Sequence, residues 1–304
     1  MHEAPPVDVA TFRAAAERYF SEIVPTKAAR TQIDNTKELE NVYAVFDNPP
    51  ALLSKIESVH ISKYIRWRMG MAKKWYAEQG RPILANAGHV RANREVALFS
   101  HIFNFARSIG LTSCTNPCAG VPKNKESGRD TYVEDDMYAA VWKAADQPLS
   151  DAMDLAYLTG QRPADTLKFT DDDVRDGMLH LQQNKTKTRA KLRIEIQGDL
   201  AEVIKRIQLR KAARPLSSTA LIVNEKGEKL GTEALRSRFD SARVKAGVAK
   251  QSFQFRDLRA KASTDKTDNS GDIRQAQKQL GHTSVSMTEG YVRNRRGSKS
   301  TPTK

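Results

Sequence analysis

The chain has 304 residues, enough for two ordinary domains, and its hydrophobic and charged fractions of 39% and 28% are typical of a globular protein with a polar surface. Its net charge of +14 favours a polyanionic partner such as nucleic acid, because Lys and Arg release counterions when they neutralise phosphates. The 2 cysteines argue against a disulfide framework and a cysteine zinc site. The sequence has no apolar run of membrane-spanning length and no signal peptide, so we expect a cytoplasmic protein.

The first part of the sequence predicts a bundle of helices. Residues 1–10 are expected to be a flexible tail. Apolar residues then recur at three- and four-residue steps, and helices are predicted over 11–23, 37–46, 60–76 and 91–109. Pro25 breaks the first pattern, and Gly110 is suited to cap the last helix. Short connections between four helices predict a small bundle over residues 11–118.

Residues 119–130 show no periodicity and are rich in glycine, proline and basic side chains. We interpret them as a basic interdomain linker that can also lie along a DNA backbone.

The second domain is predicted over residues 131–304 and is mainly helical. Period-two alternation predicts strands at 178–181 and 192–196, joined as a hairpin, and the short apolar run 221–223 is a further candidate strand. Gly160 should end a helix and Pro163 should start the next. The helices are predicted at 134–145, 150–159, 199–212, 231–246, 257–268, 272–280 and 284–291.

Two arginines are suited to hold a phosphodiester. Arg162 lies in T-G-Q-R-P and Arg259 in R-D-L-R. An arginine is permanently charged, and its planar fork can bind two non-bridging oxygens at once. Arg162 also follows a glycine turn and starts a helix, where an anion is favoured. Asp165, three residues later, could orient an arginine or be an ordinary surface carboxylate.

A lysine, a histidine and a tyrosine complete a set that could cleave a phosphodiester. The leaving 5′ oxygen needs a proton, which a hairpin lysine such as Lys185 or Lys187 could supply. His282 follows Leu-Gly, and Tyr291 comes nine residues after it (291 − 282). A tyrosine has an ordinary pKa of about 10, which nearby cations would lower. The other tyrosines lie in apolar helical patterns or away from any basic motif.

The order and context of these motifs resemble the tyrosine recombinases, the family of bacteriophage integrases, most strongly over residues 130–293. The resemblance implies a mainly α fold, in which a helical core-binding bundle precedes a mixed α/β catalytic domain with a small antiparallel sheet. It implies that Tyr291 is the nucleophile, Arg162 and Arg259 are catalytic arginines, and His282 donates a hydrogen bond to a non-bridging oxygen. The K-T-x-x-K pattern favours Lys187 as the general acid, and Lys185 is the alternative.

One position departs from the family pattern. The box that ends in Arg259 usually begins with histidine, and here it begins with Arg256. Arginine can bind phosphate but cannot act as a base near neutral pH. We therefore include Arg256 in the catalytic set and leave open which group deprotonates Tyr291.

The resemblance further implies a site-specific recombinase that cuts and rejoins duplex DNA through a 3′-phosphotyrosyl link, without ATP, cofactor or obligatory metal. The expected partners are double-stranded DNA, three further copies of the chain in a tetramer on DNA, and a DNA-bending accessory protein. The expected place of action is the bacterial nucleoid. Only about ten residues precede the first helix, so the arm-binding module of many integrases is not expected. The alternatives are a type IB topoisomerase-like enzyme and a catalytically idle DNA-binding protein. The DNA-binding candidates are Lys63, Arg66, Arg68, Arg91, Arg94, Lys123, Lys125 and Lys185.

Overall fold

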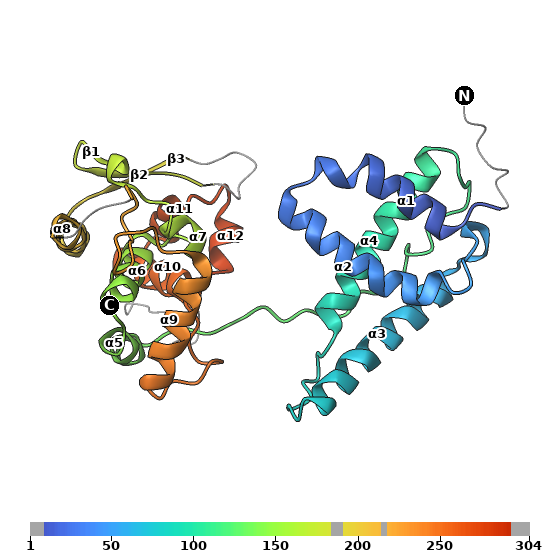
Figure 1. Ribbon diagram of the computed structural model, residues 1–304, viewed down its shortest axis with the longest axis horizontal. Helices are drawn as coiled ribbons and strands as arrows, with labels where there is room; N and C mark the ends of the chain where they lie inside the picture. Colours follow the sequence, from blue (N-terminus) through green and yellow to red (C-terminus); the bar gives the residue numbers. More distant parts are fainter. Residues whose placement is uncertain (1–8, 184–190, 214–217, 293–304) are drawn as a thin grey trace, which may run out of the picture. The chain divides into compact units, whose positions relative to one another are not determined.

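The computed structural model describes residues 9–183, 191–213 and 218–292. The chain divides into two compact units, Met1–Gly128 and Arg129–Lys304 (Figure 1). Within the described ranges, no helix combines the length and the apolar content that crossing a bilayer requires.

The first unit is a helical bundle. Its helices are α1 (Phe12–Glu22), α2 (Ala29–Phe46), α3 (Ser58–Glu78) and α4 (His89–Ser108). Helix α4 packs against the other three, and its Phe99 ring stacks on Phe12 with centroids 4.4 Å apart. The Phe46 ring centroid lies 4.9 Å from that of Phe99. Burial of these aromatic rings supplies the core of the bundle.

Helix α2 begins eight residues earlier than the sequence pattern predicts, at Ala29 instead of residue 37. Its first turns bury polar side chains where an amphipathic helix would bury apolar ones. Asn35 accepts a hydrogen bond from Lys27 at 2.8 Å and donates one to Glu38 at 3.0 Å. Apolar residues are buried only from Leu39 onward, so periodicity could not locate the start of the helix.

The second unit is mainly helical with a small sheet at one edge (Figure 1). Its elements are α5 (Asp135–Lys143), α6 (Gln147–Thr159), α7 (Pro163–Thr166), β1 (Val174–Arg175), β2 (Met178–Gln182), β3 (Lys191–Glu195), α8 (Asp199–Ala212), α9 (Thr232–Lys245), α10 (Asp257–Ser270), α11 (Ile273–Leu280) and α12 (Val285–Glu289). The strands are antiparallel in the order β1-β2-β3, and Leu179 pairs with Ile194 in the hairpin. The predicted fold class is confirmed.

The prediction of a strand at residues 221–223 was wrong in part. These residues are buried, but they form no strand of the sheet. The segment makes isolated bridges, Thr170 with Ala220 and Val223 with Lys229. A short apolar run indicates burial without fixing the backbone conformation. Strand β1, with 2 residues, was too short to leave a periodic pattern.

Two glycines end helices beside the candidate site. Gly160 ends α6 with φ 66° and Gly281 ends α11 with φ 65°, a left-handed conformation that favours glycine. Both are also tightly packed: an added Cβ would lie 3.0 Å from Leu280 Cδ2 at Gly160 and 3.1 Å from Leu192 Cδ1 at Gly281. The backbone turns that precede Arg162 and His282 therefore depend on glycine. Helix α10, which carries Arg259, packs against both α6 and α11.

Candidate active site

Arg259 lies at the centre of the candidate site, 2% exposed, on the first turn of α10. Its Nη1 donates to the Gly160 carbonyl at 2.8 Å, and its Nη2 donates to the Leu280 carbonyl at 2.9 Å. Nη2 also lies 2.9 Å from His282 Nε2. The two helix-ending turns therefore hold the guanidinium in place, as their unpaired C-terminal carbonyls accept its hydrogen bonds.

These contacts fix the tautomer of His282. An arginine can only donate, so His282 Nε2 must accept the bond from Arg259. The proton is then on Nδ1, which donates to Thr288 Oγ1 at 3.0 Å. In this structure Nε2 is engaged by Arg259, whereas the sequence prediction has His282 donate to a phosphate oxygen. Such a donation requires a second proton on the ring or release from Arg259.

Burial lowers the pKa of His282 to about 4, and the charges of Arg259 and Arg162 add to the effect. The ring is therefore neutral near pH 7. Burial also lowers the pKa of Arg259 to about 10, with the charge of Arg162 as the next cause and the interaction with Tyr291 opposing it. Arg259 stays charged at neutral pH.

Tyr291 joins this cluster directly after α12. Its backbone N–H donates to the Thr288 carbonyl at 2.8 Å, so the same threonine residue orients the histidine and the tyrosine. The Tyr291 ring centroid lies 5.2 Å from Arg259 Cζ and 5.2 Å from the His282 ring. The structure thus brings together three of the predicted residues, Arg259, His282 and Tyr291.

Arg162 is the fourth member, at the start of α7, with its side chain 20% exposed. Its Nη1 lies 3.8 Å from buried Asp165, close enough for an ion pair but not for a hydrogen bond. Among the described residues, neither Arg162 Nη1 nor Arg259 Nε has a hydrogen-bond acceptor, although both atoms are buried. A buried donor without a partner costs about 1–3 kcal/mol. Two such cationic donors are what an incoming anion would satisfy.

Four other tyrosines are engaged by carboxylates. Tyr64 donates to Glu95, Tyr138 to Asp154, and both Tyr132 and Tyr157 to Asp265. Burial is the main cause that raises the pKa of each, to about 12 for Tyr132, and the carboxylates add to it. A phenol with a raised pKa and a carboxylate acceptor is a poor nucleophile. Tyr291 instead faces Arg259 of the cluster, whereas Tyr43 faces Arg13 in the first unit.

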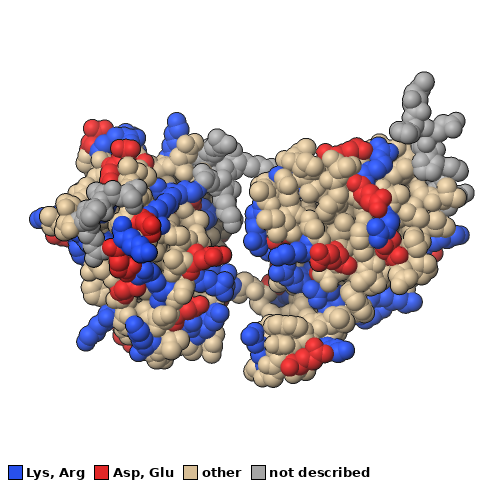
Figure 2. All heavy atoms as spheres, in the orientation of Figure 1, with Lys and Arg blue, Asp and Glu red and all other residues tan. Residues whose placement is uncertain are grey.

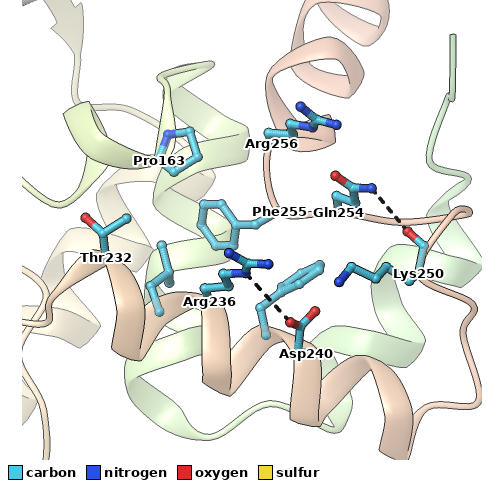
Figure 3. Close-up of a pocket in the computed structure, with 10 residues that line it drawn as sticks. Pro163, Thr232, Arg236, Asp240, Lys250, Gln254, Phe255 and Arg256 are labelled. Atoms are coloured by element: carbon cyan, nitrogen blue, oxygen red, sulfur yellow. Dashed lines mark hydrogen bonds and ion pairs between the residues drawn. The ribbon is translucent and has the colours of Figure 1, made fainter. Parts of the chain in front are cut away.

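Arg256 differs from the buried cluster in its exposure. It is exposed at the N-cap of α10 and lines a cavity of about 250 Å³ with Pro163, Phe255, Arg236 and Lys250 (Figure 3). Within the described ranges, no hydrogen bond or ion pair joins Arg256 to another residue of the predicted catalytic set. The basic rim of this cavity was not predicted, because Arg236 and Lys250 come from separate segments that carry no motif.

The two lysine candidates, Lys185 and Lys187, lie outside the described residues. The strands on either side are described: Gln182 ends β2 and pairs with Lys191, the first residue of β3. The region 183–190 therefore connects the two strands of an antiparallel hairpin, as the sequence predicts.

Lys and Arg side chains are spread over the surfaces of both units (Figure 2). The basic candidates of the first unit differ in their surroundings. The exposed ones are Lys63, Arg66, Arg91, Arg94, Lys123 and Lys125. Arg68 instead donates from Nε to buried Glu95 at 2.9 Å and joins α3 to α4. Its Nε is engaged in a structural ion pair, in contrast to the six exposed residues.

The chain on either side of Gly128 is bound to its own unit. Asn93 of α4 donates to the Asn124 carbonyl at 2.9 Å and accepts from the Asn124 N–H at 2.9 Å. Beyond Gly128, Arg129 forms a two-pronged ion pair with Asp257, with both bonds 2.6 Å long. Much of the expected linker at residues 119–130 is therefore attached to one unit or the other.

Among the described residues, no group of three His, Cys, Asp or Glu side chains is placed to hold a metal ion.

The chain matches the model of the phage integrase family over residues 133–297, which is 165 of its 304 residues. It is 29% identical to the integrase of Escherichia phage HK022 over 183 residues, which cover 58% of the chain and 51% of that protein. The chain thus spans about half the length of the curated relatives it matches.

The fold is shared with solved structures. A lambda integrase dimer bound to a COC′ core site has a TM-score of 0.78 and 21% identity, covering 98% of this chain and 82% of that one. A lambda integrase tetramer bound to a Holliday junction has a TM-score of 0.73 and 22% identity, covering 91% of this chain and 78% of that one.

Proposed function

This chain belongs to the phage integrase family, and from that premise we propose that it is a site-specific DNA recombinase of the tyrosine type. One observation carries the proposal most directly. The Tyr291 ring lies 5.2 Å from the Arg259 guanidinium, in a cluster whose buried cationic donors are not all satisfied by acceptors among the described residues. A phosphodiester is an anion that fits those donors, and the tyrosine hydroxyl is a nucleophile beside it.

In the proposed reaction the Tyr291 oxygen attacks the scissile phosphorus. A bond from this oxygen to the 3′ phosphate forms as the bond to the 5′ oxygen breaks, and the phosphodiester energy is kept in the phosphotyrosyl link. Arg162 and Arg259 hold the non-bridging oxygens, where negative charge accumulates. The 5′ hydroxyl of a partner strand then attacks the link, and Tyr291 leaves.

Two proton transfers accompany cleavage. Lys187 is proposed to protonate the leaving 5′ oxygen, and Lys185 is the alternative. Arg256 cannot accept the Tyr291 proton, so this proton goes to water, to a phosphate oxygen or to another side chain. His282, with a pKa of about 4 and its Nε2 bonded to Arg259, is a weak base in this arrangement and is better suited to orient Arg259.

The proposed substrate is duplex DNA, bound by both units. The support is the net charge of +14, the exposed basic residues of the first unit, and the fold shared with lambda integrase bound to a core site. Assembly of four protomers is proposed by analogy with the lambda tetramer on a Holliday junction. A DNA-bending accessory protein and action at the bacterial nucleoid belong to the same proposal.

The test has two steps. The first captures covalent protein–DNA adducts on fragments of the source genome and maps each junction to a nucleotide. The second places two copies of the mapped site on one plasmid and a single copy on another. A recombinase yields rearranged products that require two sites. Efficient relaxation of the one-site plasmid without rearrangement of the two-site plasmid would instead indicate a topoisomerase, and binding without any adduct an idle DNA-binding protein.

A further inference from the structure

Gln183 is a polar residue at a position where the fold calls for an apolar one. Leu179 and Leu181 of β2 face the core, at 0% and 7% exposure, and the period of two places Gln183 on the same side. Its side chain is 0% exposed. A buried amide is costly unless its hydrogen bonds are made. A glutamine here therefore indicates a requirement other than packing.

The contacts of Gln183 identify that requirement. Its Nε2 donates to Gln161 Oε1 at 2.7 Å and to the Leu280 carbonyl at 2.9 Å. Gln161 directly precedes Arg162, and Leu280 is two residues before His282. One side chain at the end of β2 thus connects the hairpin to the turns that carry two members of the candidate site.

The same network includes Arg259. The Leu280 carbonyl accepts from both Gln183 Nε2 and Arg259 Nη2, each at 2.9 Å. Gln161, 1% exposed, donates to the Thr159 and Gln279 carbonyls, both at 2.9 Å. The Gln183 amide is therefore oriented by the same helix-ending turns that hold Arg259. Its Oε1 is buried and has no partner among the described residues.

We propose that Gln183 is a positioning residue for the general acid of the strand-cleavage reaction. It fixes the end of β2 relative to Arg162, Arg259 and His282, two residues before Lys185 and four before Lys187 in the sequence. This inference rests on the proposed function. Because a general acid must lie within hydrogen-bond reach of the leaving oxygen, an anchor at the base of its segment controls the rate without touching DNA.

The test substitutes Gln183→Met, which keeps the length of the side chain and removes both donor bonds. Single-turnover cleavage is measured on two versions of the mapped site, one with the ordinary phosphodiester and one with a bridging sulfur at the 5′ position. A thiolate leaves without a proton, so the sulfur substrate does not need the general acid. We expect Gln183→Met to slow cleavage of the ordinary substrate by about 10- to 100-fold, the scale of a misplaced catalytic group. On the sulfur substrate it should cleave at close to the parent rate.

Gln279→Met is the matched control. The Gln279 side chain donates to the Leu158 carbonyl at 2.8 Å and so joins α11 to the end of α6, with no hydrogen bond to the hairpin among the described residues. It should slow both substrates by the same small factor, if at all. Should Gln183→Met reduce the folded fraction, the double variant Gln161→Met/Gln183→Met carries the same test, since replacing both partners leaves no unpaired amide between them.

The outcomes separate the inference from the function on which it rests. A Gln183→Met defect of equal size on both substrates, or no defect, overturns the positioning role while the parent still cleaves. A parent protein that cleaves neither substrate contradicts the proposed function, and the role of Gln183 with it.

Discussion

Arg259 and Arg256 lie three residues apart at the start of one helix, yet their surroundings are opposite. Arg259 is 2% exposed and bound to two carbonyls and a histidine. Arg256 is exposed at the rim of the cavity in Figure 3. Asp257, between them, accepts hydrogen bonds from Arg129 and from the Gln254 N–H.

This difference shows how one short motif can supply two kinds of phosphate contact. The buried arginine is fixed in advance, so its planar fork can act without reorganisation when charge develops. The exposed arginine is solvated and free to adjust, so its charge should matter more than its shape. Substitutions at the hairpin lysine and at the two arginines separate these kinds of contact.

The largest effect is expected at the hairpin lysine. Lys187→Ala should slow cleavage of an ordinary phosphodiester by about 10²- to 10⁴-fold, the range for a lost general acid. A 5′-bridging sulfur should restore the rate, whereas it should not restore an Arg259 variant, which fails at the non-bridging oxygens. Parallel single-turnover assays of Lys185→Ala decide the assignment: if the sulfur rescues that variant and Lys187→Ala shows no defect, Lys185 is the acid.

A matched pair of Arg→Lys substitutions tests whether burial separates the role of Arg259 from that of Arg256. Arg259→Lys should reduce single-turnover cleavage by about 10²- to 10³-fold, as for the loss of a preorganised donor, because one ammonium cannot reproduce the fork between the Gly160 and Leu280 carbonyls. Arg256→Lys should stay within a few-fold of the parent. Equal losses at the two positions would show that burial does not distinguish their roles. Circular dichroism on both variants checks that the fold is intact.

Because the pKa of His282 is lowered in the folded protein, the free energy of unfolding should depend on pH. An unfolded histidine has a pKa of about 6.5, and in the folded protein burial and the two arginines lower it to about 4. Between these values the unfolded chain binds a proton here that the folded protein does not. The free energy of unfolding should therefore fall as the pH drops from about 6.5 to about 4, by about 3 kcal/mol in all, and be independent of this residue outside that window.

Urea titrations at several pH values, for the parent and for His282→Gln, isolate this contribution. The difference in unfolding free energy between the two proteins should change across the window and be constant above it. Parallel curves for the two proteins throughout would show that His282 does not titrate as the buried cluster requires.

The smallest effect is expected at Arg256. Arg256→Ala should slow cleavage by about 10-fold or less through lost electrostatic stabilisation, since the residue is exposed. Arg256→His should remain active, because the family usually places histidine there. Single-turnover rates against pH compare the variants. If Arg256→Ala cleaves as fast as the parent at every pH, Arg256 is outside the site and the alignment of this box is wrong.

Most of the second unit could be predicted from the sequence because glycines mark the ends of its helices clearly. Gly160 and Gly281 end helices where only a left-handed backbone fits, and the chemistry-bearing residues follow within two positions of each. Short motifs of this kind can be recognised because a glycine conformation and a charged side chain are both required at fixed places.

Other features could not be predicted, since they depend on partners far away in the sequence. Gln183 shares no motif with Gln161, 22 residues away, and a buried glutamine breaks the strand pattern. In the sequence, Arg68 cannot be distinguished from its exposed basic neighbours, because its partner Glu95 lies in another helix. The tautomer of His282 follows only from the donor that faces it.

The central claim is that Tyr291 is the nucleophile of this cluster. It is tested by incubating the parent and Tyr291→Phe with a nicked suicide substrate that carries the mapped site, and by identifying any DNA-linked peptide by mass spectrometry. The account predicts a covalent adduct on the peptide that contains Tyr291 in the parent, and DNA binding without an adduct in Tyr291→Phe. An adduct of undiminished yield in the variant, or one linked to another tyrosine, would contradict it.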